Sequence, residues 1–204
     1  VKEWREYKFE QTKQSWDYVF RILYFTWTPG GVSSGFSAPV EIANVDATAG
    51  NVRNQDLWIS PEGASFLLYT EQEVASPLLR DRFFPGKSVA SSLKLAVVKD
   101  GEVVSRRTLL AGGPATEAGC ARFHAAPDGT LHAVLYVGGA DAGNKLMQIL
   151  PELENPPLLP IPLKSPMGAF CLAGVRAGNA PSSLVDMHGH TGGNTMAYAR
   201  IALR

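Results

Sequence analysis

A hairpin that occurs twice constrains this chain more than any other feature of its sequence. The stretch Asp56–Glu73 reads DLWISPEGASFLLYTEQE, and the stretch Arg122–Gly139 reads RFHAAPDGTLHAVLYVGG. In both, two apolar runs flank a Pro-x-Gly turn. Glycine accepts positive φ and aspartate bonds nearby backbone N–H groups, so such a turn joins two antiparallel strands tightly. A unit copied along the chain in this way indicates a repeat fold.

The rest of the chain carries the same strand pattern. Short alternating or apolar runs bounded by Gly, Pro, Asn and Asp recur, whereas apolar residues spaced as on a helix are scarce. The expected strands are Trp4–Gln11, Tyr18–Thr28, Val40–Asn44, Asp56–Ser60, Ser65–Glu71, Ser92–Lys99, Val103–Leu110, Arg122–Ala126, Leu131–Val137, Lys145–Leu150, Leu158–Leu163, Phe170–Arg176, Ser183–His188 and Asn194–Leu203.

These strands group into units of four in up-and-down order, which predicts an all-β fold, a β-propeller of four-stranded antiparallel blades. The expected blade segments are about 1–50, 51–118, 119–168 and 169–204, of which the two middle ones are complete. The first and last segments hold three strands each and do not merge into one blade. We therefore expect the chain to be part of a larger propeller, completed by another chain or by a segment outside this sequence. An open β-sandwich is the alternative fold.

The composition of the chain limits the kinds of partner that we expect it to bind. Hydrophobic residues make up 45% of the chain, enough for a sizeable core, and the formal net charge is +0. The absence of a basic excess argues against nucleic acid, and no apolar stretch is long enough to span a membrane. The two cysteines, Cys120 and Cys171, fall at the first strands of successive blades. Two buried free thiols and one disulfide are both compatible with that placement.

Several short motifs resemble one propeller family. GFSAPVEIA at Gly35–Ala43, the two hairpins SPEGASFLLY and APDGTLHAVLY, and NTMAYARIAL near the C-terminal end resemble degenerate repeats of the BNR or Asp-box (sialidase-like) β-propeller superfamily. Asp128–Thr130 keeps the core of the Asp box, while Ala126, His132 and Glu62 depart from it. The resemblance spreads over most of the chain.

The resemblance implies a carbohydrate-active protein that acts on a glycan or polysaccharide, as a glycoside hydrolase or as a polysaccharide lyase. It also implies a secreted or periplasmic location. The alternative is a non-catalytic module that binds glycan or protein within a larger assembly. A complete set of acid, base and arginine residues would favour the enzyme over the binding module. We cannot identify such a set in the sequence.

The mouth of the central channel is where a propeller of this kind holds its site, and the innermost strands should line it. Asp56 shares a strand face with Trp58, and Arg122 shares one with His124, because side chains alternate along a strand. Aligning the two hairpin turns places Asp56 opposite Arg122 and Trp58 opposite His124. Arginine binds carboxylates with a forked geometry, so these residues could line one pocket. Otherwise Asp56 and Arg122 form an ion pair between blades, and Trp58 is packing.

Two further sets of residues could carry catalysis. A sialidase uses a tyrosine nucleophile supported by glutamate, which Tyr69 and Glu71 would supply, together with an arginine triad that is missing. A lyase on a propeller would use tyrosine or histidine as base and arginine to neutralise a uronate. His124, His132, Tyr136 and Arg122 could fill those roles, or Tyr136 and His132 could pack between blades.

The densest polar cluster is DMHGHTGG, in which Asp186, His188 and His190 alternate onto one face. Imidazole and carboxylate are ligands for Zn²⁺ or another divalent metal, although no third, distant ligand is evident. The same side chains could contact a sugar or transfer a proton near neutral pH. A solvated hairpin is the remaining reading, and we expect no cofactor on balance. Elsewhere, the loop Leu78–Ser88 lacks a strand pattern, and its arginines and phenylalanines could cover a cleft or contact a partner.

Overall fold

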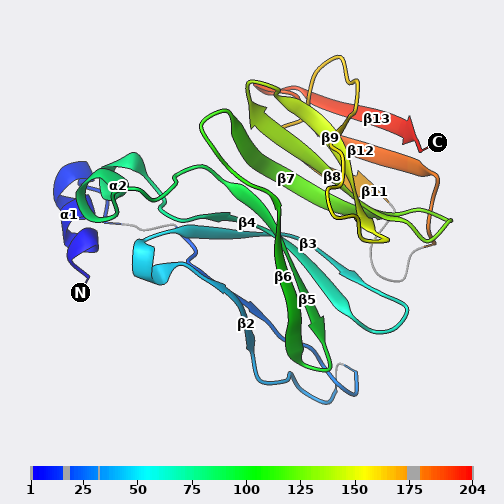
Figure 1. Cartoon of the computed structure of the whole chain (residues 1–204), viewed down its shortest axis with the longest axis horizontal. Coiled ribbons are helices and arrows are strands. Elements are labelled where there is room, and N and C mark those ends of the chain that lie inside the picture. The colour runs from blue at the N-terminus through cyan, green and yellow to red at the C-terminus, as the bar shows by residue number, and fades with distance from the viewer. Residues whose placement is uncertain (1, 16–18, 32, 174–179, 204) are drawn as a thin grey trace.

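The computed structural model describes residues 2–15, 19–31, 33–173 and 180–203. Within these ranges the protein is predominantly β, and its strands form four antiparallel sheets. Figure 1 shows the sheets following one another along the chain, with two helices at one side. The sheets resemble blades, as the sequence predicts, and the described residues do not form a closed ring of them.

Two of the sheets have four strands each, in the up-and-down order expected for blades. The first contains β3 (Asn51–Ile59), β4 (Ser65–Gln72), β5 (Ser92–Lys99) and β6 (Glu102–Leu110). The second contains β7 (Thr116–Ala125), β8 (Leu131–Gly139), β9 (Gly143–Leu150) and the short β10 (Leu159–Pro160).

The two remaining sheets are smaller. One pairs β1 (Ile22–Phe25) with β2 (Val40–Asn44), and the other orders β11 (Ala169–Ala173), β12 (Leu184–His190) and β13 (Met196–Ala202). The expected strand Phe170–Arg176 corresponds to β11, and its last residues, 174–176, lie outside the described part of the chain. The start of the expected strand Tyr18–Thr28 lies outside it as well, at residue 18.

The core consists of apolar layers between successive sheets. Phe66 and Leu68 of β4 pack with Phe123 of β7, and similar layers join β1–β2 to the β3–β6 sheet and β11–β13 to the β7–β10 sheet. The two four-stranded sheets are therefore covered on both faces, which explains why SFLLYT of β4 is buried at every position.

The innermost strand of one sheet lies beside the innermost strand of the next. β1 contacts β3, β3 contacts β7, and β7 contacts β11. The strands β3, β7 and β11, which the sequence predicts to be innermost in their blades, therefore lie next to one another in succession.

The expected strand Trp4–Gln11 is wrong, because these residues form helix α1 (Glu3–Thr12). Its sequence EWREYKFEQT is rich in good helix formers, and Glu3 and Glu6 lie in the first turn, where acidic side chains favour a helix. Trp4 is buried at 5% exposure in a small cluster with Leu79.

Helix α2 (Pro77–Phe83) lies within the expected loop Leu78–Ser88. Ser76 caps it by accepting a hydrogen bond from the Leu79 N–H, and Pro77 occupies the first turn. Phe83 packs edge-on against Tyr7 of α1, with ring centroids 5.4 Å apart. The aromatic residues of this segment therefore contribute to packing between the helices.

Candidate functional site

Side chains near the middle of the inner strands join β3 to β7. Arg122 donates to the Gln55 carbonyl oxygen at 2.7 Å, Asp56 accepts from the Phe123 N–H at 2.9 Å, and Gln55 accepts from the Ala121 N–H at 3.0 Å. Each residue thus bonds the backbone of the opposite strand, and no ion pair joins Asp56 to Arg122 within the described residues. The structure brings this predicted pair together between the blades, as a strand-to-strand link.

Trp58 and His124 are not brought together. Trp58 packs edge-on against Phe66 in the apolar layer between the two four-stranded sheets. His124 is 1% exposed, and its Nε2 lies 2.7 Å from the carbonyl oxygen of Ser182, just before β12 of the next sheet. His124 faces His132 across the β7–β8 pair, and burial lowers the pKa of both imidazoles. The buried position of the His124 ring, and not its protonation state, keeps it away from a substrate, since a general base must reach the proton that it removes.

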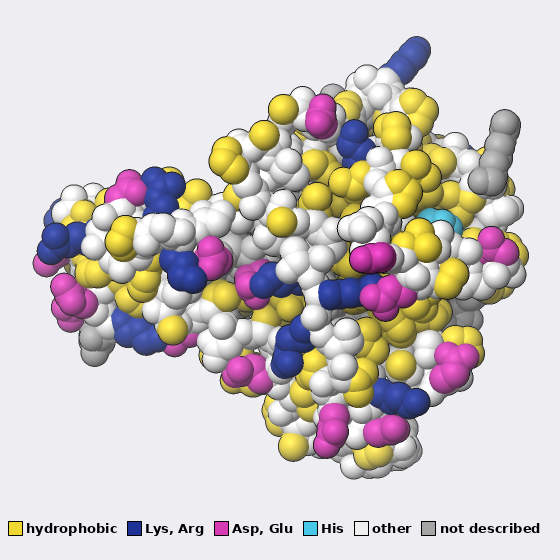
Figure 2. All heavy atoms as spheres, in the orientation of Figure 1, with side chains coloured by type: hydrophobic (Ala, Val, Ile, Leu, Met, Phe, Trp, Pro, Cys, Tyr) yellow, Lys and Arg dark blue, Asp and Glu magenta, His cyan; other side chains and the backbone are white. Residues whose placement is uncertain are grey.

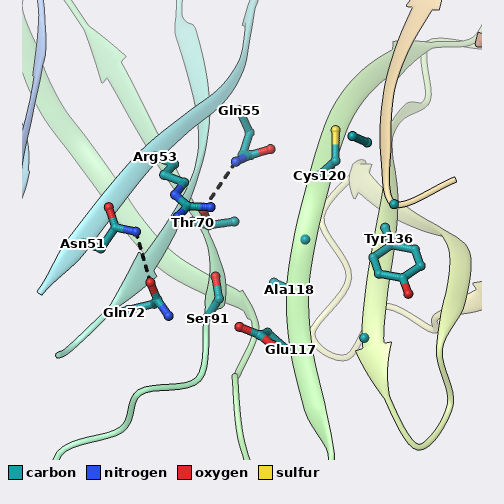
Figure 3. A pocket seen from close by; sticks show the side chains of 14 residues that line it. Asn51, Arg53, Gln55, Thr70, Gln72, Ser91, Glu117, Ala118, Cys120 and Tyr136 are labelled. Atoms are coloured by element: carbon teal, nitrogen blue, oxygen red, sulfur yellow. Dashed lines mark hydrogen bonds between the residues drawn. The ribbon is translucent and has the colours of Figure 1, made fainter. Parts of the chain in front are cut away.

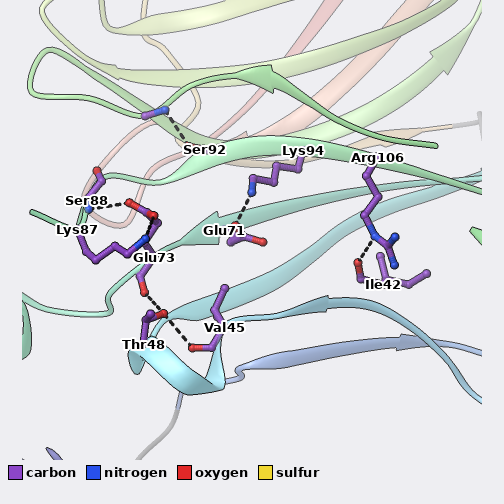
Figure 4. Close-up of polar contacts among 11 residues, drawn as sticks. Ile42, Val45, Thr48, Glu71, Glu73, Lys87, Ser88, Ser92, Lys94 and Arg106 are labelled. Carbon is purple, nitrogen blue, oxygen red and sulfur yellow. Dashed lines mark hydrogen bonds and ion pairs between the residues drawn. The ribbon is translucent and has the colours of Figure 1, made fainter. Parts of the chain in front are cut away.

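Tyr69 and Glu71 of β4 do meet, in a cavity of about 430 Å³ between β2 and β6. Burial, followed by the nearby Glu71 carboxylate, raises the pKa of Tyr69 to about 12, so its phenol is a poor nucleophile at neutral pH. Lys94 pairs with Glu71, and Arg106 donates to the carbonyl of Ile42 (Figure 4). Arg122 lies on β7, outside this cavity, so the predicted combination of Tyr69, Glu71 and Arg122 does not form.

Asp186, His188 and His190 share one face of β12, as alternation predicts, and both histidines are exposed. Asp186 accepts from both Arg200 and Tyr198 of β13, and these bonds, with Arg200 first, lower the pKa of its carboxyl. Across the described ranges, no group of three or more His, Cys, Asp or Glu side chains converges in a way that could hold a metal ion.

A polar cavity lies where β3 and β7 begin, next to the end of β4. We call it the mouth pocket; its volume is about 420 Å³. It is lined by Asn51, Arg53, Gln55, Thr70, Gln72, Ser91, Glu117, Ala118, Gly119, Cys120, Tyr136, Gly138, Gly168 and Ala169. Figure 3 shows the side chains of β3 and β4 on one side and those of β7 on the other. Of the candidate residues named from the sequence, Tyr136 lines this pocket, whereas Asp56, Trp58, Arg122 and His124 do not.

Two β-bulges shape the mouth pocket. In β3 the register shifts between Asn54 and Asp56, so Gln55 has no partner on β4. In β7 it shifts between Ala118 and Ala121, so Gly119 and Cys120 oppose the single residue Tyr136. Bulges are frequent next to functional sites because they redirect side chains. Here they lie at the same level on neighbouring inner strands and widen the space between them.

Hydrogen bonds between side chains order the β3 side of the pocket. Asn51 donates to Gln72 at 3.0 Å, and Gln55 donates to Thr70 at 3.3 Å (Figure 3). Asn51 is 7% exposed and Thr70 is 5% exposed, so these bonds satisfy polar groups that would otherwise be costly to bury. The amides are thereby held in fixed positions at the wall of the pocket.

Two charged side chains of opposite sign remain available. Arg53 of β3 and Glu117 of β7 are both exposed, and within the described residues neither makes a hydrogen bond or an ion pair. An unpaired guanidinium can take a carboxylate through two parallel hydrogen bonds, and a carboxylate accepts from hydroxyl groups. The pocket therefore combines the Arg53 guanidinium as a donor, the Glu117 carboxylate as an acceptor, and several side-chain amides.

Glycine makes room for the aromatic part of the pocket. A Cβ on Gly119 would lie 2.9 Å from Cδ1 of Tyr136, so the ring occupies space that any side chain at position 119 would fill. Beside it, Cys120 donates to the carbonyl of Phe170 at 3.3 Å, and burial raises the pKa of its thiol. Cys120 and Cys171 are both free thiols, and Cys171 is exposed.

No family model, curated protein or solved structure matches this chain. The described residues contain no helix that is both long and apolar enough to cross a lipid bilayer. The site must therefore be judged from its own residues. One residue in the sequence hints at it, because Gly119 comes shortly before the expected strand, and a glycine inside a strand marks a bulge or a close approach of chains.

Proposed function

We propose that this chain is part of a sialidase-like β-propeller and that it binds an acidic glycan in the mouth pocket. The observation that carries the proposal is the unpaired Arg53, which lies among ordered amides on the β3–β4 side of one cavity, with Glu117 on the β7 side. A guanidinium fork fits the carboxylate of a uronate or a sialate, and the amides and Glu117 fit sugar hydroxyls. A neutral or basic ligand would leave Arg53 without a partner.

The motif resemblance supports the same ligand class, since sialidase-like propellers act on glycans. It also supports a secreted or periplasmic location. Large apolar side chains are exposed on the two outermost sheets, with Phe20 and Tyr24 at 76% and 54% and Met196 and Tyr198 at 58% and 61%. Figure 2 shows how widely apolar side chains spread over the face it presents. Exposure on this scale favours further sheets, from another chain or from a segment outside this sequence, that complete the propeller.

A lyase activity is the second candidate, because Tyr136 lines the same pocket as Arg53. In such a reaction Arg53 would neutralise the uronate carboxylate, and Tyr136, as the phenolate, would remove the C5 proton. The C4–O bond would break and a C4–C5 double bond would form, and the Tyr136 hydroxyl would return the proton to the departing O4 oxygen. A hydrolase mechanism through Tyr69 has less support, since that phenol lies outside the mouth pocket and its pKa is about 12.

The test is calorimetric titration with an oligosaccharide that contains a uronate or a sialate, and with the same oligosaccharide after reduction of its carboxyl group. We expect Arg53→Gln to weaken binding of the acidic form about tenfold or more, because a charged hydrogen bond is worth roughly 1.5–3 kcal/mol. The matched control is Arg82→Gln on the exposed surface of α2, which should bind like the wild type. Equal binding by both variants would refute the proposed site.

The lyase candidate has its own readout. Unsaturated uronates absorb in the ultraviolet, so elimination would appear as rising absorbance on an acidic polysaccharide. Tyr136→Phe should abolish this signal while leaving binding in place. Binding without any absorbance change would leave the chain as a glycan-binding module.

A further inference from the structure

The mouth pocket carries two charges of opposite sign that do not meet. Among the residues that line it, Arg53 and Glu117 are the charged ones, since burial raises the pKa of the Cys120 thiol and keeps it protonated. Within the described ranges no ion pair joins Arg53 to Glu117, although both side chains are exposed and neither has another partner. The lining is therefore neutral overall, with its positive group on β3 and its negative group on β7 (Figure 3).

Glu117 lies apart from the groups that suit sugar hydroxyls. The residue directly opposite it on β8 is Gly138, which has no side chain to cover the carboxylate. Ala118 and Gly119, the next two residues of β7, also line the pocket and have no polar side chain. The ordered amides lie on the β3–β4 side instead. The carboxylate is thus a separate charged group that a bound ligand would meet on the β7 side.

An acidic sugar alone would satisfy only one of the two charges. Its carboxylate can form two parallel hydrogen bonds with Arg53, but it also brings a second negative charge into the pocket with Glu117. A sugar hydroxyl can donate to Glu117, but it does not compensate the charge of a carboxylate that the ligand partly removes from water. An ammonium group does both, because it donates hydrogen bonds and carries the opposite charge.

We propose that the ligand is a zwitterionic sugar unit, in which a carboxylate binds Arg53 and a free, protonated amine binds Glu117. The inference rests on the proposed function, because it starts from the carboxylate at Arg53. A cavity of about 420 Å³ is near the lower end of the range for small-ligand pockets, so we place both groups on one sugar or on two neighbouring sugars. A uronate linked to a hexosamine with a free amino group has this chemistry.

Calorimetric titration with a matched pair of disaccharides tests the amine. Both contain a uronate and a hexosamine, and they differ only in whether the amino group is free or N-acetylated. At about pH 6 the free amine carries its proton. We expect the free-amine form to bind about fivefold more tightly or better, and added salt to reduce that preference. In Glu117→Gln the preference should fall below about twofold, because the amide oxygen accepts a hydrogen bond but has no charge.

The control variant is Glu62→Gln, which removes the same charge from the exposed turn between β3 and β4. That turn joins the end of β3 to the start of β4, whereas the pocket lies at the opposite ends of these strands, so the full preference should remain. Free glycine carries the same two charges without a sugar. At the same concentration it should not displace the free-amine disaccharide.

The outcomes separate failure of this inference from failure of the proposed function. If neither disaccharide binds, or if Arg53→Gln binds both like the wild type, the proposed function fails and the zwitterionic ligand fails with it. If both disaccharides bind the wild type equally and Arg53→Gln weakens both, the acidic-glycan site stands and the zwitterionic ligand is refuted. A preference that persists in Glu117→Gln, or displacement by glycine, would also overturn it.

Discussion

Asp56 provides a direct test of whether the inner strands are joined by side chains or line a ligand site. Its Oδ2 accepts from the Phe123 N–H of β7 at 2.9 Å, and its Oδ1 accepts from the neighbouring Leu57 N–H at 2.9 Å. Phe123 is 1% exposed, so removing the carboxylate leaves a buried N–H without a partner. The sequence leaves Asp56 either in a ligand site or in an ion pair with Arg122 between blades, and in the structure its carboxylate bonds the backbone of β7.

The expected magnitude follows from these two bonds. A hydrogen bond to a charged group contributes roughly 1.5–3 kcal/mol, and the bond to Leu57 is local and restrains little. We therefore expect Asp56→Ala to lower the free energy of unfolding by about 2–3 kcal/mol. Asp56→Asn should cost about 1 kcal/mol, because the amide oxygen still accepts from the Phe123 N–H but without its charge.

Urea unfolding followed by tryptophan fluorescence measures both variants, and the slope with denaturant should not change. The control is Asp81→Ala, whose side chain is 66% exposed, and its effect should stay within about 0.5 kcal/mol. Glycan binding by Asp56→Asn should match the wild type under native conditions. An Asp56→Ala protein of normal stability that no longer binds glycan would refute the reasoning and restore Asp56 to the site.

Two further predictions concern the fourth sheet and its contact with the third. Burial lowers the pKa of His124, so the unfolded chain binds the proton more readily. Stability should be full above about pH 6.5 and should fall by up to about 1.4 kcal/mol per unit below it, and a flat unfolding profile between pH 7.5 and 5 would contradict this. Gly189→Ala would place a Cβ 2.3 Å from the carbonyl oxygen of Ala169, which should cost about 3 kcal/mol in thermal or urea unfolding. The control Gly168→Ala meets nothing within 4 Å and should unfold like the wild type.

The strands of the core could be predicted because a buried strand has a recognisable run of apolar residues. Ser92–Lys99 and Val40–Asn44 have the bounds that the sequence predicts, and both have apolar runs that face a neighbouring sheet. Helix α1 could not be predicted this way, since only Trp4 is buried and the remaining face is polar. The apolar pattern therefore reports burial, and a prediction based on it fails for an element that is mostly exposed.

The relative placement of the inner strands could not be predicted from alternation. Alternation assumes a straight ladder, but the bulges at Gln55 and at Gly119–Cys120 change which face each following residue presents. Trp58, expected to meet His124, packs in the apolar layer between the two four-stranded sheets, whereas His124 bonds the carbonyl of Ser182. Asp56 and Arg122 do reach the opposite strand, where each bonds a backbone group.

The sequence does not predict the mouth pocket, because the parts of β3 and β7 that line it are polar. The sequence predicts inner strands that begin at Asp56 and Arg122, whereas β3 begins at Asn51 and β7 at Thr116. The omitted halves are polar because they face a cavity, so they lack the apolar alternation that marks a strand. A strand that continues without that alternation must have its polar side chains satisfied by one another or by a ligand. Hydrogen bonds hold the amides of Asn51, Gln55 and Gln72 in place, and Arg53 and Glu117 are left as the charged groups that a ligand would meet.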